Sequence, residues 1–372
     1  MVPRRRVPRR ARPRGRYAAA LGMAACAVLA VHLAAVPADG RALLTRLADS
    51  PVFVTAVLRA ELGLAADAAE PAESVFFQQR SDEALAGLSA EPALPEPEGT
   101  AQDSPAMPAD GAVIKERTLT AGSGDAWVRS GGVTVYDRAG AAPDLDALWQ
   151  EELDLGWTEE APQVLIYHTH GTEAYAMAGS DIYEESDTAR TTDTRYNMVR
   201  VGDELAAALK ARGISVVHDR TLYDYPVYNN SYARSLEGVT GYLEQYPSIR
   251  VVLDVHRDAL EAADGTIYKT VAEVEGQTAA QVLVVVGTDI AGQEHPDWRR
   301  NLRFALAVQR QLDADWPTLA RPVTVRSYRY NQQVLPGALL IEVGTHGNTL
   351  EEALYSARLL GQSLAAVLTE ET

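Results

Sequence analysis

The pattern of apolar and polar residues predicts strands that alternate with helices from residue 161 to residue 369. Short apolar runs predict buried strands at 163–168, 214–217, 250–255, 268–274, 281–286, 323–328 and 338–343. Runs with helical spacing predict helices at 196–211, 231–246, 297–312 and 349–367. Strands that alternate with helices are typical of a mostly parallel sheet covered by helices on both faces, so we expect one α/β domain here.

The first 38 residues have a different pattern. Residues 1–16 contain eight arginines and no acidic residue, and residues 17–38 contain no charged side chain apart from a possible proton on His32. As a helix, residues 17–38 would extend about 33 Å, which is enough to cross a bilayer. The arginines predict a cytoplasmic N-terminus and an exported body. We expect an uncleaved, single-pass membrane anchor and not a signal peptide, because the apolar segment is longer than a signal core.

Between the predicted anchor and the α/β domain we expect two further segments. Residues 39–111 read as a linker that is largely disordered, because the stretch from 65 to 110 is rich in Ala, Pro, Glu, Ser and Gly. Residues 112–160 contain two short apolar runs, at 126–129 and 132–136, separated by glycines. This segment predicts a small β-rich lead-in that packs on the following domain.

Charge and cysteine content exclude some classes of protein. The net charge is −17 although the N-terminus is strongly basic, so the body is acidic and is unsuited to binding nucleic acid through a broad basic face. The single cysteine, Cys26, lies in the apolar segment. The predicted exported part therefore has no disulfide, no cysteine metal ligand and no thiol nucleophile.

Candidate chemistry gathers at the ends of three predicted strands. His168 and His170 end the first, His256 and Arg257 follow another, and Glu342 lies in the last. Strand ends that are distant in sequence can converge at one crevice, and two histidines with carboxylates are typical of a catalytic zinc site that keeps a position for water. Strand alternation puts His168 on the face of His170, as a candidate for orienting it. A structural carboxylate network, with Glu342 paired to Arg257, is the alternative that spacing leaves open.

Four motifs in order, spanning residues 113–369, resemble the stage II sporulation protein P family: VLIYHTHGTEAY, TDTRYNMVRVGDELAAALKARGISVVHD, YPSIRVVLDVHRDA and ALLIEVGTHGNTLEEA. More distantly, the same blocks resemble the zinc-dependent N-acetylmuramoyl-L-alanine amidases of the amidase-3 type. This resemblance implies that His170 and His256 are zinc ligands and that Glu342, in IEVG before Asn348, is the catalytic glutamate.

The resemblance leaves the middle ligand between two residues. The wider family has a glutamate four residues before an asparagine that opens a helix, and this chain has Asp193 four residues before Asn197. An aspartate reaches less far than a glutamate. We therefore expect Asp193 as the ligand, with Glu173 as the alternative. Arg257 and His168 are candidates for contacting the substrate or the oxyanion.

The resemblance implies a zinc-dependent cell-wall hydrolase, which cuts the amide between N-acetylmuramic acid and L-alanine and is associated with endopeptidase activity. It also implies work with the sporulation proteins D and M at the membrane during engulfment, with peptidoglycan as the substrate. A membrane-tethered protein of the same fold that binds peptidoglycan without turnover is the alternative. A metal-dependent deacetylase or phosphatase would suit the histidines and aspartate but not the IEVG motif with its asparagine.

Overall fold

The computed structural model describes residues 111–179, 182–183 and 189–370. The predicted basic N-terminus, the predicted anchor and all but the last residue of the predicted linker lie outside these residues. Among the helices of the described residues, none combines the length and apolar character needed to cross a membrane.

The described elements follow the predicted alternation closely. The strands are β1 (Ile114–Arg117), β2 (Trp127–Ser130), β3 (Val133–Asp137), β4 (Val164–Tyr167), β5 (Val216–His218), β6 (Val251–Asp258), β7 (Ile267–Val274), β8 (Gln277–Ala280), β9 (Val282–Gly287), β10 (Val323–Arg326) and β11 (Ala338–Thr345). The α-helices are α5 (Leu145–Gln150), α6 (Met198–Ala211), α7 (Ser231–Gln245), α8 (Trp298–Asp315) and α9 (Leu350–Glu370), and a short 3₁₀ turn, η1, covers Gln332–Val334. The sequence pattern did not predict β1, β8 or η1, each of which is four residues or shorter.

Within the described residues, the main sheet has eight strands in the order β2-β3-β10-β9-β11-β6-β4-β5. β11, β6, β4 and β5 are parallel to one another, and β3, β10 and β9 form a second parallel block. The two blocks meet at β9 and β11, which are antiparallel. The α/β prediction is confirmed, but the sheet is mixed. β9 reverses because the chain reaches it from β6 through the strands β7 and β8, without the crossover helix that a parallel connection needs.

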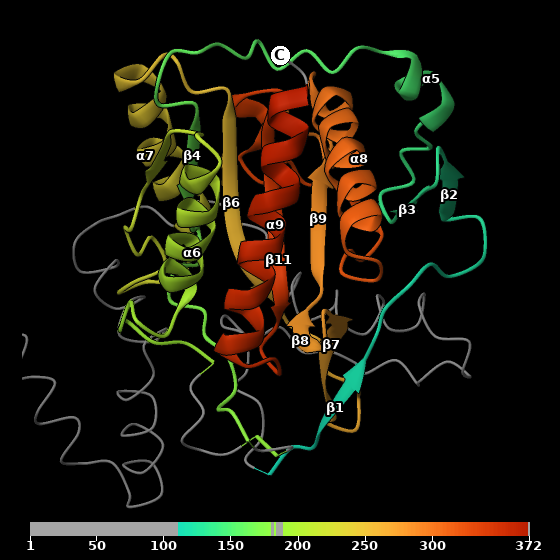
Figure 1. Cartoon of the computed structure of the whole chain (residues 1–372), viewed down its shortest axis with the longest axis vertical. Helices are drawn as coiled ribbons and strands as arrows, with labels where there is room; N and C mark the ends of the chain where they lie inside the picture. The colour runs from blue at the N-terminus through green and yellow to red at the C-terminus, as the bar shows by residue number, and fades with distance from the viewer. Residues whose placement is uncertain (1–110, 180–181, 184–188, 371–372) are drawn as a thin grey trace, which may run out of the picture. The chain divides into compact units, whose positions relative to one another are not determined.

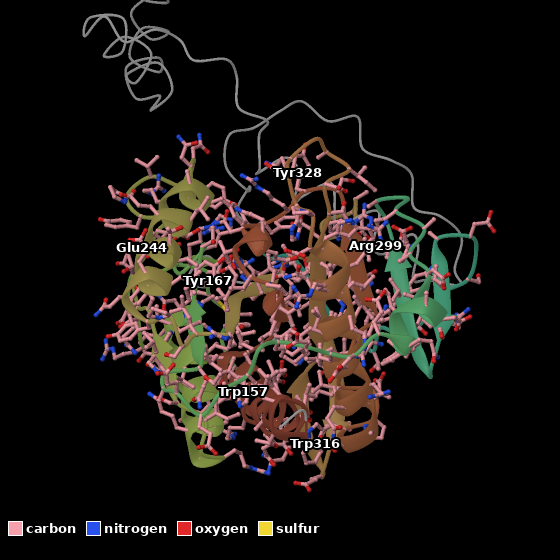
Figure 2. All side chains as sticks on the ribbon, turned by 90° about the horizontal axis from the view of Figure 1, so that it is seen from above. Trp157, Tyr167, Glu244, Arg299, Trp316 and Tyr328 are labelled. Atoms are coloured by element: carbon pink, nitrogen blue, oxygen red, sulfur yellow. The ribbon has the colours of Figure 1, made fainter. Side chains whose placement is uncertain are left out.

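Helices cover both faces of this sheet. Figure 1 shows α6, α9 and α8 side by side over one face, with α7 behind the sheet. Val164 and Ile166 of β4 pack into the core under the first group, whereas Leu165 and Tyr167 pack with Val239 of α7. In Figure 2, Tyr167 lies within the body of side chains. β4 is therefore apolar on both faces, which explains why its sequence is a continuous apolar run.

The segment from 112 to 160 contributes strands to both sheets. β2 and β3 form an antiparallel pair that extends the main sheet where β3 pairs with β10. β1 pairs in parallel with β7 in a three-stranded sheet of order β1-β7-β8. Backbone hydrogen bonding therefore joins this segment to the α/β part of the chain.

The arrangement of β4, β6 and β11 sets the position of the candidate site. Because these three neighbours are parallel, their carboxyl ends lie at one edge of the sheet. A register shift interrupts the pairing of β11 with β6 between Glu342 and Thr345, and Gly344 within it has a φ of 65°. A bulge of this kind turns a strand locally and suits glycine, because a side chain at positive φ is strained.

Two glycine substitutions test how closely α6 and α9 pack. A Cβ at Gly361 would lie 2.5 Å from the Cβ of Ala208, whereas a Cβ at Gly241 in α7 would meet nothing within 4 Å. We expect Gly361→Ala to destabilise the protein by about 1–3 kcal/mol through overpacking. We expect Gly241→Ala to stabilise it by about 0.5–1 kcal/mol, because alanine favours the helix. Denaturant unfolding of both variants measures the difference, and a stabilised Gly361→Ala variant would contradict the close helix contact.

Candidate functional site

The structure brings together three residues that the sequence singles out. His170, just beyond β4, His256 in β6 and Glu342 in β11 are all fully buried. The ring centroids of His170 and His256 lie 5.3 Å apart, and the two ring planes are nearly perpendicular. Glu342 is the residue opposite His256 in the pairing of β11 with β6. The convergence of strand ends expected from the sequence therefore occurs.

The carboxylate beside His256 belongs to Glu173. Its Oε2 lies 3.6 Å from Nδ1 of His256. Two ligands of one tetrahedral zinc ion, each with a bond of about 2.1 Å, are separated by about 3.4 Å. The contact between Glu173 and His256 thus has nearly the spacing of a ligand pair.

Asp193 makes a different contact. Both of its carboxylate oxygens accept hydrogen bonds from the Arg195 side chain, at 2.6 to 3.2 Å, and its side chain is 37% exposed. These hydrogen bonds hold the pKa of Asp193 at about 2. Asn197 caps α6 as expected, accepting from the backbone of Val199.

Glu173 lies next to the start of α6 although it is distant from that helix in sequence. Its carbonyl accepts a hydrogen bond from the backbone N–H of Met198, at 3.1 Å. The following residue, Ala174, forms a β-bridge with Asn197. Glu173 therefore lies beside the start of α6, the part of the chain where the resemblance implies the middle ligand.

Asp254 is a site residue that the sequence reasoning missed. Its Oδ1 lies 2.7 Å from Nε2 of His256 and accepts from the backbone N–H of Thr169, and its Oδ2 accepts from the Thr169 hydroxyl. Neither ring nitrogen of His256 has a well-aligned hydrogen bond, in spite of these short contacts. The signal in the sequence is an acidic residue two positions before a strand-end histidine, and so on the same face of a buried strand.

Burial and neighbouring charges shift the pKa values of His170, His256 and Glu173. Burial lowers the pKa of His170 well below its ordinary value, so this ring is neutral. Burial alone would lower the pKa of His256 as well, but Asp254 and Glu173 beside it raise that pKa well above its ordinary value. Burial alone would raise the pKa of Glu173, but Arg257, His256 and Arg190 hold it well below its ordinary value. Glu173 is therefore a buried, charged carboxylate.

Arg257 holds the chain around Glu173. Its guanidinium donates to the carbonyls of Ala174 and Ala189, at 2.9 and 2.7 Å, and its backbone N–H donates to Oε2 of Glu173, at 3.3 Å. These donors fix the segment that carries the carboxylate. In this structure the contacts of Arg257 are thus those of a supporting residue.

Arg190 is a second arginine at Glu173, and the sequence reasoning missed it. It donates to Oε1 of Glu173 at 3.3 Å and to Oδ2 of Asp224 at 2.7 Å. Its guanidinium also lies over the ring of Tyr228, 4.6 Å from the centroid. No spacing in the sequence connects these residues, because they come from separate loops.

His168 lies on the α6 side of β4. Its Nδ1 donates to the carbonyl of Val255 at 2.7 Å, and its Nε2 lies 2.9 Å from Nε2 of His218. Gly202 of α6 packs against both rings, since a Cβ there would lie about 2.5 Å from them. β4 ends at Tyr167, so strand alternation does not govern the direction of His168 relative to His170.

The imidazoles of His170 and His256 and the carboxylate of Glu173 are the candidate donors to a metal ion. Across residues 111–179, 182–183 and 189–370, no three His, Cys, Asp or Glu side chains are arranged as a ready-made metal site. The chemistry of the donors does suit zinc, because two imidazoles and one carboxylate are the ligands of many catalytic zinc sites. His256 contributes buried ring nitrogens without aligned hydrogen bonds, at ligand spacing from Glu173.

The sequence of the chain matches one family model, that of stage II sporulation protein P, over residues 97–365. The chain belongs to the stage II sporulation protein P family. A relative in Bacillus subtilis (strain 168), stage II sporulation protein P, is 28% identical over 206 residues. The match covers 52% of this chain and 48% of the relative, so the chain spans about half the length of that protein.

Solved structures with a similar fold include amidases. The N-acetylmuramyl-L-alanine amidase Ami1 from Mycobacterium smegmatis is 15% identical, with a TM-score of 0.33, and the match covers 57% of this chain and 100% of that one. The CwlD amidase from Clostridioides difficile, solved in complex with the GerS lipoprotein, is 13% identical, with a TM-score of 0.37. That match covers 56% of this chain and 98% of the amidase chain.

In this member of the stage II sporulation protein P family, Asp254 should matter for stability as well as for the site. Asp254→Asn turns one of its acceptors into a donor, which leaves Thr169 or His256 facing a group of the wrong kind. We expect the free energy of unfolding to fall by about 1–3 kcal/mol, because Asp254, Thr169 and His256 are all buried. Asp193→Asn is the matched control and should leave the melting temperature nearly unchanged, since exposed ion pairs contribute little. Equal melting temperatures for the two variants would contradict the role given to Asp254.

Proposed function

We propose that this protein is a zinc-dependent N-acetylmuramoyl-L-alanine amidase that acts on peptidoglycan during sporulation. The observation that carries the proposal is the buried cluster in which Glu173 and Asp254 flank His256 while Glu342 lies opposite it on the neighbouring strand. Membership of the stage II sporulation protein P family supports the same reading. Buried carboxylates and imidazoles at the edge of a sheet suit hydrolysis better than packing.

The residues that would hold zinc are His170, Glu173 and His256. When bound, zinc would act as a Lewis acid and would lower the pKa of a water molecule to about 7. Asp254 orients the His256 ring through Nε2, which directs Nδ1 toward Glu173. We thus take Glu173, and not Asp193, as the middle ligand.

The remaining steps fall to side chains of this chain. Glu342, a buried carboxylate on β11, takes a proton from the attacking water and delivers it to the nitrogen of the departing stem peptide. The amide carbon of the lactyl group gains the hydroxyl and becomes a carboxylic acid, while L-alanine leaves with a free amino group. Arg257 and Arg190 keep Glu173 charged and in place.

The cellular setting is part of the proposal. The apolar segment 17–38, preceded by eight arginines, would anchor the protein in the cell membrane with the catalytic part on the extracytoplasmic side. Work with the sporulation proteins D and M during engulfment, which the resemblance to the family implies, belongs to the same proposal. Analysis of the products released from sacculi tests for the endopeptidase activity on peptide cross-links that the family resemblance implies.

Removal of the general base should greatly slow turnover without removing the metal. We expect Glu342→Gln to lower the rate of stem-peptide release from sacculi by about 10²–10⁴-fold, the usual contribution of a general acid or base. The zinc content of the variant, measured by elemental analysis, should equal that of the wild type. Release at the wild-type rate would show that Glu342 has another role.

The two candidate middle ligands can be separated by metal affinity. We expect Glu173→Gln to weaken zinc binding at least 10-fold in competition with a chromogenic chelator, because an amide is a poorer ligand than a carboxylate. Asp193→Asn should bind zinc as the wild type does, because Asp193 pairs with Arg195. Circular dichroism of both variants checks the fold. The reverse order of affinities would make Asp193 the ligand.

The alternative function is a membrane-tethered adaptor that binds peptidoglycan without cleaving it. Such a protein would bind sacculi in the presence of a strong chelator and would release no stem peptide when zinc is added. The amidase requires zinc for release. The same preparation therefore distinguishes the two functions.

A further inference from the structure

Tyr228 lies directly on His170. The two rings are stacked, with centroids 4.6 Å apart and an angle of 12° between their planes. The phenol Oη lies 3.2 Å from Nε2 of His170. His170 is fully buried, whereas Tyr228 is half-buried in a loop whose residues 225–227 are exposed. The hydroxyl of a partly buried side chain thus lies next to the candidate ligand.

The stacking fixes the direction from which the hydroxyl approaches. Nearly parallel rings whose centroids are only 4.6 Å apart must overlap face to face, so Oη, 3.2 Å from Nε2, lies over the face of the His170 ring. The lone pair of an imidazole nitrogen points along the plane of the ring. A group bound to Nε2 along that plane would therefore have the Tyr228 hydroxyl at its side. The hydroxyl does not lie along the direction of the lone pair.

Independent contacts hold Tyr228 in this position. Asp224, in the same loop, accepts hydrogen bonds from the backbone N–H and the hydroxyl of Thr172, two residues after His170. Arg190 forms ion pairs with both Asp224 and Glu173. Its guanidinium also lies over the Tyr228 ring, 4.6 Å from the ring centroid. The loop is therefore fastened to the residues around the candidate ligands, which is the preorganisation that a catalytic hydrogen-bond donor needs.

We propose that Tyr228 is a catalytic residue whose hydroxyl donates a hydrogen bond to the oxygen of the scissile amide. This inference rests on the proposed amidase function. When water adds to the amide carbon, the carbonyl oxygen gains negative charge, and Tyr228 stabilises that charge without giving up its proton. The oxygen returns to a carbonyl as the C–N bond breaks. The nitrogen leaves with the proton that Glu342 delivers, so water is the one co-reactant consumed.

The test is Tyr228→Phe in the full-length chain, because phenylalanine keeps the ring that stacks on His170 and lies under Arg190. We expect kcat for stem-peptide release to fall about 10- to 1,000-fold with KM nearly unchanged, as for loss of one oxyanion donor. Zinc affinity should stay at the wild-type value. Binding of a muramyl-peptide phosphinate, whose charged oxygens resemble the tetrahedral intermediate, should weaken by a similar factor.

Tyr225→Phe is the matched control, because Tyr225 lies in the same loop and is 59% exposed. It should leave kcat, zinc affinity and phosphinate binding unchanged. A Tyr228→Phe variant as active as the wild type would overturn the inference and leave the amidase standing. A variant that loses zinc in proportion to activity would overturn it too, because the hydroxyl would then act by positioning His170 for metal binding. A wild-type chain that releases no stem peptide would overturn the amidase and the inference together.

Discussion

The contact between Asp254 and His256 is the interaction on which the rest of the site depends. Asp254 is buried in the middle of the sheet, where a carboxylate is costly unless polar groups surround it. Two hydrogen bonds from Thr169 stabilise it, and the His256 ring lies 2.7 Å from its Oδ1. The same contacts tie the chain after β4 to β6. The contacts that Asp254 makes therefore position both the loop that carries His170 and the ring of His256.

A second constraint is the balance of charge around Glu173. Two arginines and a histidine surround this buried carboxylate and keep its pKa low. Each arginine also binds something else: Arg257 holds the carbonyls of Ala174 and Ala189, and Arg190 holds Asp224 and the ring of Tyr228. The groups that stabilise the charge are thus the groups that position the loops. Changes at either arginine should alter the shape of the site together with its charge.

The sequence predicted the strands and helices because apolar periodicity reports burial, and it predicted His170, His256 and Glu342 because strand ends of parallel neighbours converge. It did not predict that β9 would reverse, since this depends on the connection through β7 and β8. It also favoured Asp193 over Glu173 beside the helix. The resemblance favours Asp193, four residues before Asn197, whereas the bridge between Ala174 and Asn197 brings Glu173 next to the start of the helix, which is why we propose Glu173 as the ligand. Arg190 and Tyr228 come from separate loops and follow no motif.

We propose that His170, Glu173 and His256 form one metal site beside Glu342. Anomalous diffraction at the zinc edge, from crystals of the protein grown with zinc, would locate the metal and its ligands. We expect one strong anomalous peak within bonding distance, about 2.0–2.2 Å, of a nitrogen of each histidine and an oxygen of Glu173. A peak bound by Asp193 in place of Glu173, or no peak at His256, would contradict it.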